Sequence, residues 1–276
     1  MGQPMLNPKL DLLKKFLEDN FSNEPVSIAF SGGLDSRFLA YACDYLGFPV
    51  KLYHISGPHL SRQETIEAQK WANERNFPLE ILSLSPLAHP EVQQNSKTRC
   101  YHCKKCLFSF LLTKTNKVCD GTNHSDLGSY RPGIQALQEL KILSPLAKAG
   151  LSKREIRLLG EQIGLDNVQQ PSRPCLLTRF PYDSRITLEK LANIERVENK
   201  IQEILDKSKL RTLPFRVREV KQPYLAIHIA ENNKERVSAQ LVKTLEKETS
   251  EITSDRKVKV IFLPTLSGYF DTDSQT

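Results

Sequence analysis

The residues best suited to chemistry form the stretch Ser31-Gly32-Gly33-Leu34-Asp35-Ser36. Two adjacent glycines let the backbone turn tightly and approach a bulky anion without a Cβ in the way. Amides at the start of a following helix would point at that anion, and the helix dipole favours negative charge there. Ser31 and Ser36 add hydroxyl donors, and Asp35 can hold a magnesium ion that bridges phosphate oxygens. The stretch therefore predicts a phosphate-binding loop.

The flanking residues supply the elements that must position this loop. An apolar run over 26–30 predicts a buried strand before it, and apolar residues at helical spacing predict a helix after it: Phe38, Leu39, Ala42 and Leu46. The spacing is not that of a Walker loop, because no lysine closes it. A glycine-rich turn with incidental serines is the structural alternative. The S-G-G-x-D-S pattern resembles that of the PP-loop ATP pyrophosphatases, in which the loop binds the pyrophosphate end of ATP.

Cys175 is the most interesting single cysteine. It lies between Arg173 and Arg179 on a proline-rich segment, which predicts partial exposure. Nearby guanidinium groups favour the thiolate, the form that acts as a nucleophile or metal ligand. Packing as a small apolar residue is the alternative interpretation.

Three further cysteines are spaced by three residues: Cys100, Cys103 and Cys106. On a helix this spacing gives a drifting stripe, so two or three thiolates could share one metal centre. A structural zinc site would need a fourth ligand. An iron–sulfur cluster held by three cysteines fits a set completed from elsewhere in the fold, and unligated thiols on a helix are the third interpretation.

Several motifs in order resemble the family of ATP-dependent sacrificial sulfur transferases (LarE). They are Arg99-Cys100-Tyr101-His102-Cys103-Lys104-Lys105, Asp120-Gly121-Thr122-Asn123, Tyr130-Arg131-Pro132-Gly133, Ser144-Pro145-Leu146, Cys175 with Thr178-Arg179 and Pro181-Tyr182, and Arg216-Val217-Arg218. The resemblance runs from Phe30 to Tyr269 and so covers nearly the whole chain.

This resemblance implies adenylation of a carboxylate of a pyridinium dicarboxylate mononucleotide, followed by its conversion to a thiocarboxylate for the nickel-pincer cofactor. The sulfur would come from Cys175, which is left as dehydroalanine, or from a sulfide on a [4Fe-4S] cluster held by Cys100, Cys103 and Cys175. ATP and Mg²⁺ are the implied cofactors.

Further site residues follow from the same comparison. Gly121, Thr122 and Arg131 are expected to contact the nucleotide, together with the loop residues Ser31, Gly32, Gly33, Asp35 and Ser36. Arg179, Arg216 and Arg218 are expected to bind the anionic substrate, since a guanidinium matches phosphate and carboxylate. Arg216 and Arg218 as ordinary strand arginines are the alternative.

Two departures from the family pattern affect the C-terminal part. The family's histidine after R-V-R is replaced by Glu219, and its G-Y-R segment reads Gly268-Tyr269-Phe270. Both changes fall where substrate contacts and the subunit packing of a homo-oligomer are expected, and they leave the exact sulfur acceptor open.

The chain as a whole has 276 residues, a net charge of +7 and 39% hydrophobic residues, which suits a cytoplasmic globular protein with no membrane segment. The basic balance fits small anions as well as RNA. Six cysteines at this size do not indicate a secreted disulfide framework.

Strands at 26–30, 50–55, 79–84 and 117–120 alternate with helices, which predicts an α/β fold with a parallel sheet. The PP-loop resemblance implies that this fold is of the adenine nucleotide alpha hydrolase-like (HUP) type. Beyond 182 the pattern changes to a helix over 187–207, strands at 215–218, 225–229 and 258–262, and a helix over 234–247. We therefore expect a PP-loop domain over 1–182 and a small α+β domain over 183–276.

Three other functions stay open on the sequence. A tRNA thiolase of the same superfamily fits the basic charge, although no large basic extension or aromatic-rich platform supports it. ATP-dependent amide formation with ammonia would need no cysteine. A nucleotide- or metal-sensing module would bind without turnover.

Overall fold

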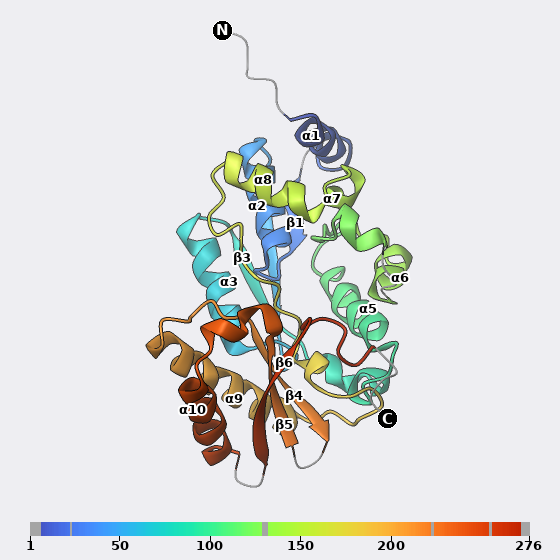
Figure 1. Cartoon of the computed structure of the whole chain (residues 1–276). Coiled ribbons are helices and arrows are strands. Elements are labelled where there is room, and N and C mark those ends of the chain that lie inside the picture. Colours follow the sequence, from blue (N-terminus) through green and yellow to red (C-terminus); the bar gives the residue numbers. More distant parts are fainter. Residues whose placement is uncertain (1–6, 23, 129–131, 222–223, 254–255, 272–276) are drawn as a thin grey trace. The chain divides into compact units, whose positions relative to one another are not determined.

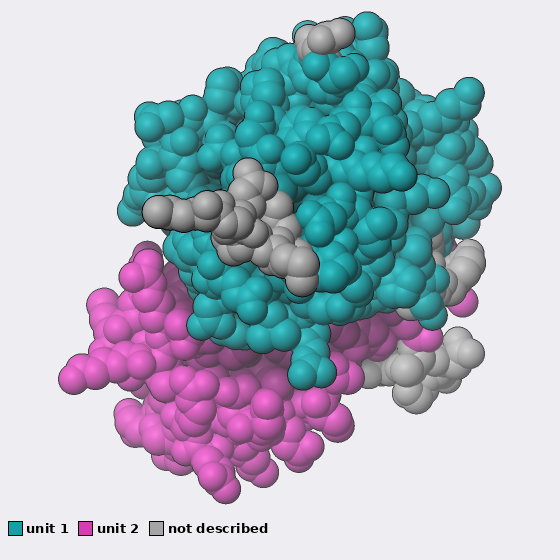
Figure 2. All heavy atoms as spheres, turned by 90° about the horizontal axis from the view of Figure 1, so that it is seen from above, with its two compact units in different colours: residues 1–89, 98–173 teal, residues 90–97, 174–276 magenta. Residues whose placement is uncertain are grey.

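The computed structural model describes residues 7–22, 24–128, 132–221, 224–253 and 256–271. The chain forms two compact units (Figures 1 and 2). The first unit comprises Met1–His89 and Thr98–Arg173, and the second comprises Pro90–Lys97 and Pro174–Thr276. The position 183, where the sequence texture changes, lies inside the second unit.

A parallel sheet with the order β1-β2-β3 is the centre of the first unit. Its strands are β1 (Val26–Ala29), β2 (Val50–Ser56) and β3 (Leu79–Ser83). Val26 pairs with Val50, and Leu52 pairs with Leu79. The α/β class with a parallel sheet, predicted from alternating strands and helices, is confirmed.

Helices pack on both faces of this sheet. Successive strand residues point to opposite sides, so each strand contributes side chains to both packing layers. On β2, Leu52 packs into a core with α1, α2, α3 and α8, whereas Tyr53 packs with α5 and α6 on the other face. The helices of the first unit are α1 (Pro8–Asn20), α2 (Leu34–Tyr45), α3 (Arg62–Glu74), α5 (Arg99–Leu111), α6 (Pro132–Glu139), α7 (Pro145–Lys148) and α8 (Lys153–Gln162), with the 3₁₀ turns η1 (Pro86–Ala88) and η2 (His124–Gly128).

The predicted fourth strand over 117–120 is wrong in extent. This segment forms only isolated bridges, in which Cys119 pairs with Ile28 on one side and Leu143 on the other. The backbone bonds from Ala29 N to Cys119 O and from Cys119 N to Ser27 O are both 2.8 Å. The segment therefore lies beside β1 and delivers Asp120 to the carboxyl end of the sheet.

The second unit contains a separate sheet with the order β4-β5-β6. β4 (Phe215–Lys221) and β5 (Tyr224–Ala230) are antiparallel, and β6 (Lys257–Leu263) runs parallel to β5. α9 (Leu188–Lys207) packs against β4, and α10 (Ala239–Glu251) packs against β6 and α9 (Figure 1). The unit also holds α4 (Pro90–Gln93), η3 (Leu176–Arg179) and η4 (Glu231–Arg236).

The helix predicted over 234–247 is wrong at its start. A 3₁₀ turn ends at Arg236, and α10 begins only at Ala239 because the Ser238 side chain caps it by accepting from the amide of Leu241. The N-cap of α9 is Thr187, as the sequence predicts.

Among the described residues, no helix combines the length and the apolar character that crossing a bilayer requires.

Candidate functional site

The loop between β1 and α2 has the geometry expected of an anion site. Gly32 has a φ of +74°, a backbone conformation that residues with a side chain rarely adopt. A Cβ at this position would lie 3.0 Å from the Cβ of Ala68 on α3. Gly33 is the N-cap of α2 and provides no side-chain cap. The amides in the first turn of α2 have no acceptor within the helix, so they are available to a ligand.

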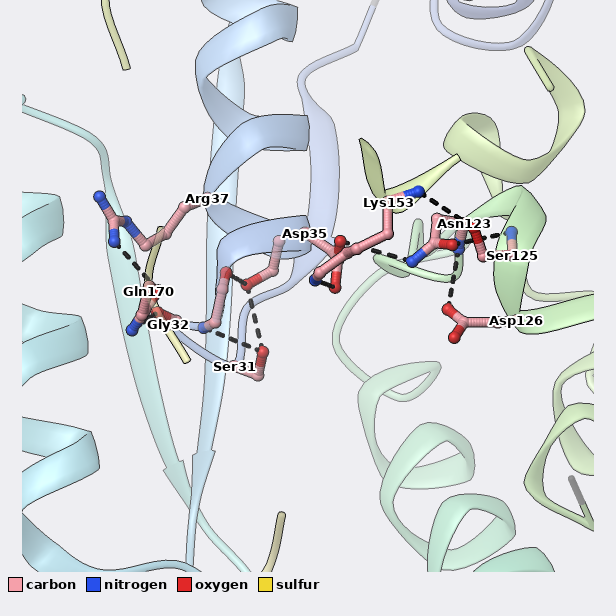
Figure 3. A network of polar contacts seen from close by, with 11 residues as sticks. Ser31, Gly32, Asp35, Arg37, Asn123, Ser125, Asp126, Lys153 and Gln170 are labelled. Atoms are coloured by element: carbon pink, nitrogen blue, oxygen red, sulfur yellow. Dashed lines mark hydrogen bonds and ion pairs between the residues drawn. The ribbon is translucent and has the colours of Figure 1, made fainter. Parts of the chain in front are cut away.

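Two hydroxyl groups are already held in this loop (Figure 3). Ser36 Oγ donates to the carbonyl of Gly33 over 3.0 Å, and Ser31 Oγ accepts from the Gly33 amide over 3.3 Å. The two hydroxyl oxygens are 3.2 Å apart. These contacts fix the rotamers of both serines beside the N-terminus of α2.

Asp35 is the centre of a polar network next to the loop. Its Oδ2 pairs with Lys153 Nζ at the start of α8, and its Oδ1 accepts from Asn123 Nδ2 over 3.4 Å. Asn123 is itself held in place. Its Oδ1 accepts from the backbone amide of Ser125, and its own backbone amide donates to Asp126 Oδ2 (Figure 3). Two segments distant in sequence thus converge on the one carboxylate that α2 provides.

This donor set fits a magnesium ion. Mg²⁺ prefers carboxylate and phosphate oxygens and keeps several waters. The Asp35 side chain is 26% exposed, so water and a bound phosphate can reach its oxygens. The fit supports the prediction that Asp35 is a magnesium ligand.

The segment Asp120-Gly121-Thr122 lies against the N-terminus of α2. A Cβ on Gly121 would lie 3.0 Å from the amide nitrogen of Ser36, so glycine permits this close approach. Thr122 Oγ1 donates to the buried carboxylate of Asp120, which also accepts from Ser144 Oγ over 2.7 Å. The Thr122 hydroxyl proton is therefore used inside the protein. Arg131, the third predicted nucleotide contact, lies outside the described residues.

Gln170 is a residue that the sequence reasoning missed. Its Nε2 donates to the carbonyl of Gly32 over 3.3 Å, and its Oε1 accepts from Arg37 Nη1 over 3.0 Å (Figure 3). Arg37 also pairs with Asp166 at 2.9 Å. Burial is the main cause of the lowered pKa of Arg37, and Asp166 opposes it. No local pattern could have linked Gln170 to the loop, because the pairing depends on the fold.

The three cysteines of α5 follow one another by about one turn each. Cys100 is exposed, and Cys103 and Cys106 are half-buried. Within the described part of the chain, these three thiols do not form a group close enough to hold one ion. A cluster would therefore need a ligand from elsewhere, and its prediction with Cys100, Cys103 and Cys175 stays a prediction.

Cys175 lies at the start of the second unit. It is half-buried, and none of the six cysteines, all of them described, forms a disulfide. Its carbonyl accepts from the amide of Thr178 over 3.1 Å and from Thr178 Oγ1 over 2.8 Å. These bonds close the 3₁₀ turn η3 and fix the backbone at Cys175.

The three predicted substrate arginines gather in the second unit. Arg179 Nε donates to Glu198 Oε1 over 2.6 Å, and Glu198 also accepts from the amide of Val217. Arg216 and Arg218, two residues apart on β4, both donate to the carbonyl of Leu266. All three guanidinium groups belong to buried residues.

Their surroundings favour an anion. Burial lowers the pKa of Arg216 to about 10, and the charges of Arg179 and Glu198 act on it in opposite directions. Burial lowers the pKa of Arg218 to about 10 as well, with added repulsion from Arg216 and Arg179. Buried positive charges need counterions, and for these three arginines Glu198 supplies a single negative charge.

His228 on β5 completes this cluster, although the sequence reasoning noted only a missing histidine. Arg218 Nη1 donates to His228 Nδ1 over 2.7 Å, and the Tyr269 ring lies 4.3 Å from the imidazole and 4.8 Å from the Arg218 guanidinium. Burial and the charge of Arg218 lower the pKa of His228 to about 3. The imidazole is therefore neutral and acts as an acceptor for Arg218.

Comparisons with known proteins agree with these features. No protein-family model matches the chain. The chain is 38% identical over 200 residues to an uncharacterised protein of Synechocystis sp., covering 70% of this chain and 74% of that one. It is 33% identical over 195 residues to an uncharacterised protein of Methanocaldococcus jannaschii, covering 69% and 74%.

A third relative has a named activity. The pyridinium-3,5-bisthiocarboxylic acid mononucleotide synthase of Lactiplantibacillus plantarum is 28% identical over 186 residues, covering 65% of this chain and 67% of that one. Together with the loop at β1 and the parallel sheet, these relatives establish the family. The chain belongs to the LarE family of ATP-dependent sacrificial sulfur transferases, within the PP-loop ATP pyrophosphatase superfamily.

Proposed function

We propose that the protein is an ATP-dependent sulfur transferase that adenylates a substrate carboxylate and converts it to a thiocarboxylate. The substrate class is an anionic mononucleotide that carries a carboxylate, of the kind named for the relative from Lactiplantibacillus plantarum. Within this proposal, Ser31, Gly32, Gly33 and Ser36 bind the phosphates of ATP, and Asp35 holds the magnesium ion.

The first unit supports the adenylation step. The substrate carboxylate oxygen attacks the α-phosphorus, and the bond to the β-phosphate oxygen breaks, so that pyrophosphate leaves. The loop amides and the fixed Ser31 and Ser36 hydroxyls face the negative charge that develops on the leaving group. Bound magnesium supplies Lewis-acid neutralisation of the same oxygens.

The link between Gln170 and Gly32 is the observation that carries the sulfur-transfer proposal. Gln170 contacts the carbonyl of the phosphate loop, and Cys175 follows only five residues later. Five residues of fully extended chain span at most about 18 Å. The covalent chain itself therefore limits how far Cys175 can lie from the residue that touches the loop.

The proposed transfer balances without an oxidant or reductant. The Cys175 thiolate attacks the acyl carbon of the adenylate, a carbon–sulfur bond forms and AMP leaves. Loss of the Cys175 Cα proton to a base then breaks the bond between Cβ and Sγ. The products are the thiocarboxylate and a dehydroalanine at position 175.

Arg216 and Arg218 are the proposed anchor for the substrate anion. Their guanidinium groups are buried with an excess of positive charge, and a guanidinium matches phosphate or carboxylate by two parallel hydrogen bonds. Arg179 supports them less directly, because Glu198 already pairs with it.

The test is an intact-mass measurement on protein purified without oxygen, before and after incubation with Mg·ATP and the carboxylate substrate. We expect release of pyrophosphate and a loss of about 34 Da, one hydrogen sulfide, at Cys175. The Cys175→Ala variant should adenylate but transfer no sulfur, whereas the matched control Cys106→Ala should retain both activities.

Other outcomes would separate the alternatives. A brown protein with stoichiometric iron and an unchanged mass would favour the cluster route through Cys100, Cys103 and Cys175. Full activity of Cys175→Ala with ammonia as the nucleophile would favour amide formation. Salt-sensitive tRNA binding would favour a tRNA thiolase, and binding of ATP with no pyrophosphate release would favour a sensor.

A further inference from the structure

Lys153 is the ion-pair partner of the proposed magnesium ligand. Its Nζ pairs with Asp35 Oδ2, although 118 positions separate the two residues in sequence. In the part of the chain that the structure describes, this carboxylate is the one acceptor of the Lys153 ammonium. The pair is partly accessible, with side-chain exposures of 32% for Lys153 and 26% for Asp35.

The backbone of Lys153 is firmly anchored, which leaves only the long side chain to move. Lys153 is the first residue of α8, which is closed by a capping box between Ser152 and Glu155. The Lys153 amide donates to Ser125 Oγ over 3.1 Å, and Lys9 holds Glu155 from α1. A fixed backbone with a flexible four-carbon stem lets one ammonium change partners within a small radius.

A magnesium ion on Asp35 would favour such a change. Asp35 accepts Lys153 on one oxygen and Asn123 on the other, so a metal ion on this carboxylate would lie close to the Lys153 ammonium. Repulsion between cations selects the ammonium as the group that leaves. Other nearby carboxylates are engaged, since Glu155 pairs with Lys9 and Asp126 accepts from the Asn123 amide.

We propose that Lys153 is a catalytic residue that exchanges Asp35 for the pyrophosphate end of ATP when magnesium binds Asp35. The inference rests on the proposed use of Mg·ATP. Without nucleotide, Lys153 neutralises a carboxylate that would repel phosphate. With Mg·ATP bound, the released ammonium donates to phosphate oxygens and stabilises the leaving pyrophosphate. The exchange makes the empty site neutral and the occupied site more positive.

Binding measurements on the full chain can detect this exchange without any turnover. The probes are Mg²⁺ alone and inorganic pyrophosphate alone, titrated calorimetrically into wild type, Lys153→Met and Lys153→Arg. Lys153→Met should bind Mg²⁺ more tightly, because no ammonium competes for Asp35. It should bind pyrophosphate about tenfold more weakly, because Asp35 is then no longer neutralised and repels the anion. The affinities of Lys153→Arg for both probes should lie between those of wild type and Lys153→Met.

Two further variants sharpen the test. Asp35→Asn should bind metal-free pyrophosphate about tenfold more tightly than wild type, because Lys153 is released and the repelling carboxylate is gone. Arg154→Met is the matched control, since it removes an exposed cation next to Lys153 on α8 and should leave both titrations unchanged. If Lys153→Met does not fold, the Asp35→Asn titration still decides the question.

The outcomes for Lys153 and for the proposed function are distinct. Equal pyrophosphate affinity in wild type, Lys153→Met and Asp35→Asn would overturn the exchange, even in a protein that transfers sulfur. Opposite shifts for metal and pyrophosphate in Lys153→Met would support it, even if no sulfur is transferred. A merely structural lysine would weaken both ligands together, which also contradicts the exchange.

Discussion

The side-chain amide of Gln170 donates a hydrogen bond to the carbonyl oxygen of Gly32 over 3.3 Å. The same side chain accepts from Arg37 on α2, so the phosphate loop, the helix behind it and the segment leading to Cys175 share one buried residue. A residue in this position connects the place where a nucleotide would bind with the chain that carries the proposed sulfur donor.

Replacing Gln170 should therefore loosen the loop. Gln170→Leu leaves the Gly32 carbonyl and one nitrogen of Arg37 without their partner, and we expect the free energy of unfolding to fall by about 1–3 kcal/mol. Urea unfolding can be followed by the fluorescence of Trp71, the single tryptophan, which is buried in the same unit. Gln169→Leu, at an exposed neighbouring position, is the control. Equal midpoints for the two variants would contradict the role given to Gln170.

Gly32 should be far less tolerant of alanine than Gly47. Both glycines have a positive φ, +74° and +85°, so alanine is strained at either position by about 1–2 kcal/mol. A Cβ on Gly32 also meets the Cβ of Ala68 at 3.0 Å, whereas one on Gly47 meets nothing within 4 Å. We expect Gly32→Ala to lose ATP binding and more stability than Gly47→Ala, which should bind ATP normally. Calorimetric titration with ATP and thermal unfolding measure the two effects.

His228 should make the second unit sensitive to acid. Burial and the adjacent Arg218 lower its pKa from 6.5 to about 3 in the folded state. Between pH 6.5 and 3 the unfolded chain therefore binds a proton that the folded chain does not. Stability through this group is fully present above pH 6.5 and falls as the pH decreases, by at most about 1.4 kcal/mol per pH unit.

The replacement His228→Asn isolates this contribution. Asparagine can still accept from Arg218 but does not titrate, so the variant should lose less stability than wild type between pH 7 and pH 5. Urea unfolding followed by circular dichroism at pH 7 and pH 5 gives the change in the free energy of unfolding with pH for each protein. Identical slopes would show that His228 is not the group responsible.

Removing the charge of Arg179 should lower the free energy of unfolding, whereas removing the charge of Arg216 should not. Arg179→Met leaves Glu198 in a largely buried position without its ion pair, and we expect a loss of about 3–5 kcal/mol in the free energy of unfolding. Arg216→Met removes a charge that burial disfavours, since the pKa of Arg216 is lowered to about 10. That variant should keep or gain stability but bind inorganic phosphate about tenfold more weakly. Arg185→Met, at an exposed position, should change neither quantity. A similar loss of stability in Arg179→Met and Arg216→Met would contradict an anion-binding role for Arg216.

Local signals in the sequence were sufficient for the elements around the loop. The apolar run before Ser31 and the glycines after it predict a strand, a turn and a helix, and the structure has β1 and α2 in that order, each ending one residue before the predicted pattern does. Ser152 and Glu155 have the three-residue spacing of a capping box, and this box is present at the start of α8. These features depend on residues three or four positions apart, so a single sequence contains the information for them.

Boundaries that depend on competing local signals were less accurate. The segment 117–120 has the apolar character of a strand, but Cys119 bonds to β1 and to Leu143 only through isolated bridges. Near 234, the charged run suits a helix, yet Ser238 offers a better cap for a helix that starts later. Neither result could be read from propensity alone, because pairing and capping decide between nearly equal alternatives.

Only the tertiary structure decided which side chains meet. Lys153 pairs with Asp35 across 118 positions, and Gln170 reaches Gly32 across 138. His228 meets Arg218 because β4 and β5 are antiparallel in one register. Parallel strands bring the loops at their carboxyl ends to one edge of the sheet, so residues without any sequence pattern become neighbours. The sequence by itself determined the family motifs and the glycine loop that we propose as the anion site, and folding determined which side chains contact those residues.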